Sequence, residues 1–283
     1  MIRTALQVVV LAVTATAAAS AERVVSLGGA VTEIVVALEQ AHRLVARDTT
    51  STWPEEITGL PDVGYMRALS AEGILSMDPD LILAAEGAGP AEAVAMLRAA
   101  RIPYAEIPDA TSGAGVLDRI AAVADALGVP ERGAALIAQM RAELGQMAGM
   151  RDTVERSAQV LFVLSMEGGR IMASGRGTAA DGMIRMAGGT NAIDQFEGYR
   201  LLTDEAVLDA DPEVVLMMDR GGGHDVTADA LFAHPALSTT AAGTDRRLIR
   251  MDGLLLLGFG PRTARAARTL HCALYPQARD CAD

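Results

Sequence analysis

Residues 69–83 read LSAEGILSMDPDLIL, and residues 202–216 read LTDEAVLDADPEVVL. Each stretch begins with a serine or threonine that can cap a helix, and each places a glutamate, Glu72 or Glu205, at the second helical position. Each then turns at an Asp-Pro pair and enters an apolar strand. A helix–turn–strand unit that occurs twice in one chain predicts two lobes built on similar plans.

Apolar strands alternate with helices around both copies of this unit. Strands are predicted at residues 23–27, 44–46, 81–84, 104–107, 160–164, 214–217 and 248–250. Helices are predicted at about residues 30–38, 70–77, 91–100, 178–187 and 261–274. Because alternating strands and helices form parallel sheets covered on both faces, we expect an α/β protein with two Rossmann-like lobes.

A long alanine-rich region separates the two halves. One helix is predicted over residues 115–127, and Gly128-Val129-Pro130 breaks it. The helix that follows, over residues 131–156, is too long for a crossover within one small sheet, because ~20 residues of helix span ~30 Å. The expected organisation is an N-terminal α/β lobe at 22–128, a bridging backbone helix at 129–156 and a C-terminal α/β lobe at 157–283.

The first residues are typical of a secretory signal peptide. Arg3 supplies the charged start, residues 5–13 are apolar, and Ala19-Ser20-Ala21 matches an A-x-A cleavage site. The apolar run is shorter than the ~18 to 20 residues that a membrane span needs, and no later run approaches that length. Residues 1–21 are therefore predicted to be removed, which leaves a periplasmic protein with no direct membrane insertion.

The charge of the chain limits its partners. The net charge is −12, and all 24 basic residues are arginines. Such an acidic protein argues against nucleic acid or anionic lipid as the main partner. An anionic small ligand held by a few local arginines stays compatible with this charge.

The chain has two cysteines, Cys272 and Cys281. In an exported protein, a pair that closes a short loop is expected to form a disulfide. A metal or redox pair is the alternative, and no other thiol or paired histidine accompanies it.

The stretch PDVGYMRALS at residues 61–70 places Tyr65 two residues before Arg67, on a loop that Pro and Gly open. The chain holds four Tyr, four Phe and one Trp in 283 residues, so this aromatic is not generic core filling. A guanidinium favours the charged form of a neighbouring phenol. Tyrosinate is a known protein ligand of haem iron. The alternative is a surface tyrosine with an arginine neighbour.

Four segments carry a family resemblance: VSLGGAVTE at 25–33, LPDVGYMRALS at 60–70, TAAD at 178–181 and LGFGPRT at 257–263. They resemble the haem-binding branch of the substrate-binding proteins with a helical backbone, which serve bacterial ABC importers of metal chelates. The resemblance covers essentially the whole mature chain. It implies a monomer that captures haem b (iron protoporphyrin IX) between its lobes and delivers it to a permease dimer with its ATPase.

The resemblance also assigns the iron ligands. Tyr65 is then the axial ligand, and Arg67 bonds its phenolate oxygen or pairs with a propionate. Some members add a histidine from the loop after the first strand of the C-terminal lobe. Here residues 164–169 read LSMEGG, and Met166 lies nearest that position. A thioether prefers ferrous iron, so we expect five-coordinate iron with Met166 packed over the distal face; Met166 as sixth ligand is the alternative.

Other residues are candidates for the ligand site. Arg176, in the SGRG stretch at 174–177, is expected to face the cleft, where it reaches a propionate or is simply solvated. Tyr199 precedes the second repeat unit and is expected to border the ligand. His224, in a glycine-rich loop, is a weaker candidate for iron, whereas His42, His234 and His271 read as ordinary element-end or surface residues.

The resemblance also implies that Glu72 and Glu205 dock onto arginines of the permease. The alternative is that both are helix-start acids that interact with the helix dipole. Glu33, near the start of the first helix, has the same alternative and a weaker claim to docking.

Enzyme motifs are missing from the sequence. Gly28-Gly29 lacks the full G-x-G-x-x-G pattern, and there is no G-x-S-x-G, H-E-x-x-H or P-loop. We therefore expect a binding protein and no enzyme. A corrinoid or ferric-siderophore carrier is the alternative within the binding class, with Tyr65 and Arg67 only lining the cleft, and an exported enzyme is the alternative from another class.

Overall fold

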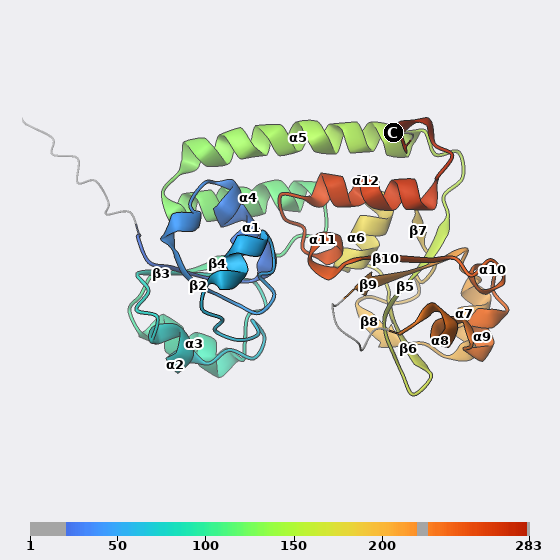
Figure 1. Cartoon of the computed structure of the whole chain (residues 1–283), viewed down its shortest axis with the longest axis horizontal. Coiled ribbons are helices and arrows are strands. Elements are labelled where there is room, and N and C mark those ends of the chain that lie inside the picture. The colour runs from blue at the N-terminus through green and yellow to red at the C-terminus, as the bar shows by residue number, and fades with distance from the viewer. Residues whose placement is uncertain (1–20, 220–225, 282–283) are drawn as a thin grey trace, which may run out of the picture.

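Two β-sheets lie side by side in the computed structural model, which describes residues 21–219 and 226–281 (Figure 1). The first sheet is parallel, in the order β2-β1-β3-β4. Its strands are β1 (Val24–Leu27), β2 (Leu44–Arg47), β3 (Leu81–Ala85) and β4 (Tyr104–Ile107). The expectation of an α/β fold with parallel sheets is therefore confirmed for this half.

The second sheet has the order β10-β9-β5-β6-β8, with β7 paired to β5 off this path. It is parallel across β10, β9 and β5, and antiparallel across β5, β6 and β8. Its strands are β5 (Gln159–Glu167), β6 (Arg170–Ser174), β7 (Thr190–Asn191), β8 (Tyr199–Leu201), β9 (Val214–Asp219) and β10 (Leu248–Asp252). The antiparallel β6 and β8 are additions to the predicted strands.

Helices cover both faces of each sheet. Those of the first half are α1 (Gly29–Ala37), α2 (Ala71–Leu75), α3 (Ala91–Ala99) and α4 (Gly113–Leu127). Those of the second half are α6 (Ala179–Met186), α7 (Asp204–Ala210), α8 (Ala228–Phe232), α9 (Pro235–Ser238), α10 (Ala241–Thr244), α11 (Gly253–Leu257) and α12 (Thr263–Leu274). The two repeat units form as predicted: Ser70 and Thr203 cap α2 and α7 with their side chains, and each helix leads into an apolar strand.

Helix α5 (Pro130–Asp152) has 23 residues and extends from above α4 in the first half to above α12 in the second (Figure 1). Gly128, in a left-handed conformation, ends α4, and Pro130 occupies the first turn of α5, where its missing N–H costs no hydrogen bond. The predicted helix thus exists and ends four residues early. The predicted limits of the two lobes on either side of it stay a prediction.

One hydrophobic core runs through both halves on the side of α5. It joins Val31 and Ile120 of the first half to Met140 of α5 and to Phe162 and Leu270 of the second. Separate cores lie on the opposite face of each sheet. Continuous burial of this kind makes the two halves one packed body near α5 and leaves them separate at their far ends.

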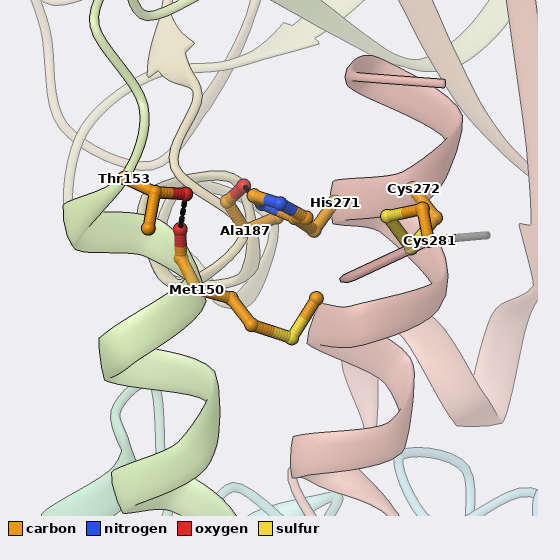
Figure 2. Close-up of a disulfide and its surroundings, with 6 residues drawn as sticks. All are labelled: Met150, Thr153, Ala187, His271, Cys272 and Cys281. Atoms are coloured by element: carbon orange, nitrogen blue, oxygen red, sulfur yellow. Dashed lines mark hydrogen bonds between the residues drawn. A yellow bond between two sulfur atoms is a disulfide. The ribbon is translucent and has the colours of Figure 1, made fainter. Parts of the chain in front are cut away.

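Cys272 and Cys281 form a disulfide that ties the C-terminal tail to α12, with a Cα–Cα distance of 5.3 Å. Figure 2 shows this bond on one side of α12, while His271 points to the other side and Nδ1 lies 3.0 Å from the Ala187 carbonyl oxygen. Met150 of α5 extends toward α12 in the same view. The expected pairing is the one that the structure contains.

The predicted signal peptide lies outside the described residues except for Ala21. Among the helices at 21–219 and 226–281, none is long and apolar enough to cross a membrane.

Candidate functional site

The Tyr65 loop, residues 61–69, lies at the carboxyl edge of the first sheet. Val63 N–H donates to the Arg47 carbonyl (3.0 Å) at the end of β2, and Gly89 N–H, just beyond β3, donates to the Met66 carbonyl (2.9 Å). The carboxyl edge of a parallel sheet is where α/β proteins place their ligands. The predicted tyrosine is therefore carried by a segment in a position suited to binding.

Tyr65 and Arg67 both project outward from this loop. Tyr65 is 45% exposed and Arg67 is also exposed, whereas Met66 between them is half-buried, with its sulfur beside Gly28. Among the described residues, Arg67 has no ion-pair partner. A phenol and an unpaired guanidinium are thus presented together to solvent.

Tyr199 is the aromatic candidate on the second sheet. It lies on β8 opposite Ser174, its ring packs edge-on against Phe162 at 6.4 Å, and it is 38% exposed. Burial raises the pKa of the Tyr199 phenol, while the Thr178 hydroxyl and the Arg67 guanidinium act in the opposite direction. Arg67 of the first half thus acts electrostatically on a side chain of the second sheet.

Arg119 of the first half bonds to a backbone carbonyl of the second half. This buried side chain of α4 donates to the Asp109 carboxylate (2.6 Å), the Pro108 carbonyl (2.8 Å) and the Gly258 carbonyl (2.7 Å). Burial lowers the pKa of Arg119, and Asp109 acts against that shift. Sequence reasoning missed this residue, although an arginine on the otherwise apolar face of a predicted helix was a usable signal.

A second connection between the halves joins Glu33 of α1 to Arg262. The pair is bidentate and buried: Arg262 Nε lies 3.2 Å from Glu33 Oε2, and the Glu33 side chain is 5% exposed. Burial raises the pKa of Glu33, and the hydrogen bond from Arg262 lowers it. Arg262 also stacks 4.6 Å from the ring of Trp53, the chain's one tryptophan. The docking role considered for Glu33 is therefore wrong, because a buried, paired carboxylate cannot reach another protein.

Met166 does not lie in a loop, as expected, but within β5, which continues as a hairpin into β6. It pairs with Ile171 and packs against the core that contains Leu161 and Val163. Phe162, which contacts Tyr199, belongs to the core on the other face of the sheet. Met166 and Tyr199 thus point to opposite faces.

The remaining candidates are Arg176 and the histidines. Arg176 is exposed, with its guanidinium 4.0 Å from Glu197. His224 falls outside the described residues. His234 and His271 are buried, not on the surface, and each lies within hydrogen-bond distance of a backbone carbonyl.

Glu72 and Glu205 are both exposed at the second position of their helices. Helices α2 and α7 lie in different halves, on the side of each that is remote from α5 (Figure 1). Each glutamate is therefore exposed on a helix at the side of its own half that is remote from α5.

Comparison with known proteins gives consistent matches. A solved structure of the periplasmic heme-binding protein RhuT from Roseiflexus sp. RS-1, in apo form, is 41% identical, with a TM-score of 0.85 over 91% of this chain and 99% of that chain. A periplasmic heme-binding protein from Pseudomonas aeruginosa is 34% identical, with a TM-score of 0.84 over 92% of this chain and 94% of that chain. The vitamin B12-binding protein of Yersinia pestis is 28% identical over 203 residues, which are 71% of this chain and 70% of that protein.

A protein-family model also matches most of the chain. The match runs from residue 24 to residue 254 and so includes both sheets, α5 and the Tyr65 loop. The chain belongs to the periplasmic binding protein family.

Proposed function

We propose that this protein is a periplasmic haem carrier that delivers haem to an ABC importer. The observation that carries the proposal is the joint presentation of Tyr65 and Arg67 at the carboxyl edge of the first sheet, with the Arg67 charge acting on Tyr199 of the second sheet. The similarity to periplasmic heme-binding proteins at 34–41% identity supports it. Binding rather than turnover agrees with the family to which the chain belongs.

The chemistry of haem fits these side chains. Ferric iron accepts an anionic oxygen ligand, which Tyr65 provides as tyrosinate. The two propionates require cations, and Arg67 provides one; Arg176 is available as a second. The apolar ring requires aromatic and aliphatic contacts, and Tyr199 and the 49% exposed Leu201 offer them from β8. Met166 lies on the opposite face, which favours five-coordinate iron.

Delivery assigns a role to Glu72 and Glu205. One exposed glutamate from each half gives a two-point contact for arginines of a permease dimer. Surface charge pairs of this kind direct orientation and encounter more than they add affinity.

A corrinoid carrier is the second candidate, because vitamin B12-binding proteins are relatives at 28% identity. Both ligands hold their metal in a macrocycle, but cobalamin carries its own axial ligands, whereas ferric haem takes an axial ligand from the protein. The two candidates therefore differ in their dependence on the Tyr65 oxygen.

The test is a titration of mature protein with ferric haem, wild type beside Tyr65→Phe and Met166→Leu. We expect a high-spin ferric spectrum with a charge-transfer band in wild type and in Met166→Leu. Tyr65→Phe should lose the band and bind more than about 10-fold more weakly, since even an outer-shell partner has that effect on a metal site. A spectrum unchanged in Tyr65→Phe, or tighter binding of cobalamin than of haem, would refute the haem proposal.

A further inference from the structure

The Tyr65 loop is fixed by one carboxylate that the motif itself contains. Asp62 Oδ1 accepts hydrogen bonds from Gly64 N–H (2.8 Å) and from the Thr49 hydroxyl (3.2 Å), and Asp62 Oδ2 accepts one from Arg47 Nη1 (2.9 Å). Asp62 is thus bonded on both oxygens, to its own loop and to the end of the neighbouring strand.

These bonds control the peptide that precedes the tyrosine. Gly64 N–H is held by Asp62, and its carbonyl accepts from Thr49 N–H (3.0 Å). Gly64 has φ +94°, a conformation that side-chain-bearing residues rarely adopt. Both ends of this residue are therefore set in a conformation that determines the direction in which Tyr65 leaves the backbone.

Arg47, which bonds to Asp62, is itself held by hydrogen bonds at the end of the sheet. Arg47 is the last residue of β2, its side chain is 12% exposed, and Nη1 also donates to the Asp48 carbonyl (3.1 Å). Asp48 is buried and accepts hydrogen bonds from Gly28 N–H (3.0 Å) and the Ser51 hydroxyl (2.7 Å). A continuous set of hydrogen bonds therefore links the Tyr65 loop to the edge of the sheet.

We infer that Asp62 is a positioning residue that holds the Tyr65 phenol and the Arg67 guanidinium in binding geometry before the ligand arrives. Preorganisation removes the cost of ordering the loop from the binding step and so raises affinity, and affinity differences between variants of one site lie mostly in the release rate. The inference rests on the proposed function, because it concerns Tyr65 as an iron ligand.

The test compares Asp62→Ala and Asp62→Asn with a matched control, Asp80→Ala. Asp80 is also an exposed aspartate that accepts two backbone N–H bonds, from Glu22 (2.8 Å) and Arg23 (2.9 Å), but it lies at the amino end of the same sheet. Haem release to excess apo-myoglobin, the charge-transfer band and the thermal midpoint are measured for each. Hydrogen exchange of the amides at 63–68 is measured without haem.

We expect Asp62→Ala to release haem about 10-fold faster, with a weakened band and faster exchange at 63–68. Asp62→Asn keeps an acceptor for Gly64 and should retain most of the wild-type band. Asp80→Ala should lower the thermal midpoint and leave release and the band unchanged. Wild-type release in Asp62→Ala, or equal effects of Asp62→Ala and Asp80→Ala on release, would overturn the inference.

The two proposals fail in different ways. If Tyr65→Phe leaves the haem spectrum unchanged, the proposed function fails, whatever Asp62 does. If Tyr65→Phe abolishes the band but Asp62→Ala behaves as wild type, tyrosinate ligation stands and only the positioning role is lost.

Discussion

Two tyrosines lie at the proposed site, and their surroundings give them different tasks. Burial raises the pKa of Tyr199 above its ordinary value near 10.0, which favours the neutral phenol at this position. Tyr65 is more exposed and neighbours Arg67 on the same loop. The proposed iron ligation is therefore assigned to Tyr65 on its motif and exposure, and the more buried Tyr199 is assigned contact through its phenol.

Replacing Tyr199 by Phe should keep the charge-transfer band and weaken haem binding by about 3- to 10-fold, the value of one hydrogen bond. Tyr104→Phe is the matched control. Burial also raises the pKa of Tyr104, but this residue lies on β4 with Arg98 stacked 4.5 Å from its ring. A haem titration of both variants decides the matter: loss of the band in Tyr199→Phe would make Tyr199 the ligand.

The residues of the site differ in how far the sequence could predict them. Tyr65 and Arg67 could be predicted from the sequence, because both belong to a short motif on a loop that Pro and Gly residues mark. Met166 was wrongly predicted to lie in a loop, because the predicted strand ended before it, whereas β5 includes it. Gly168 and Gly169, with φ +57° and +77°, form the tight hairpin turn, and this glycine pair was the signal for an antiparallel continuation. Asp62 was part of the quoted motif, but its partners, Arg47 and Thr49, are known only from the fold.

At the scale of elements, helices with their own start and stop signals were predicted closely. The side-chain caps of α2, α6 and α7 and the left-handed Gly128 after α4 are local features. The short β8, α9 and α10 were not predicted. Four-residue helices and a three-residue strand cannot form alone, so their existence depends on tertiary contacts that no local pattern contains.

The contact between α4 and α5 depends on one glycine. A Cβ added at Gly133 would lie 2.5 Å from Ala124 Cβ, whereas one added at Gly145, in the same helix, would meet nothing within 4 Å. Gly133→Ala should therefore destabilise the protein by about 1–3 kcal/mol through overpacking. Gly145→Ala should stabilise it by up to ~1 kcal/mol, the helix preference of alanine. Urea unfolding of the two variants tests this, and equal effects would contradict the close packing of the helices.

At the scale of the whole molecule, the two sheets are joined more firmly than a single linking helix would allow. The shared core passes from α1 and α4 through α5 to α12. Arg119 of α4 and Glu33 of α1 then connect the first half to Gly258 and Arg262 of the second. We expect ligand capture with small relative movement of the lobes, since opening them widely would expose both a buried guanidinium and a buried ion pair.

The contribution of the Glu33–Arg262 pair to this connection can be measured from the pH dependence of the unfolding free energy. Burial raises the pKa of Glu33 above its ordinary 4.5, so the folded state binds a proton more readily than the unfolded state. Stability contributed by this group is therefore present below pH 4.5 and is lost as the pH rises through the raised value. Arg262→Gln removes the hydrogen bond that lowers this pKa and leaves a carboxylate buried without a cation.

We expect Arg262→Gln to lose about 3 kcal/mol of unfolding free energy at pH 8, because breaking a buried pair leaves an uncompensated charge. The loss should be smaller at pH 5 than at pH 8, because the raised pKa of Glu33 favours proton uptake as the pH falls. The double variant Glu33→Gln/Arg262→Gln should recover stability at pH 8 and show no such pH dependence. Urea unfolding of the three proteins at both pH values gives the comparison. A loss of equal size at pH 5 and pH 8, unrelieved in the double variant, would mean that Arg262 acts through its stacking on Trp53 and not through the buried charge.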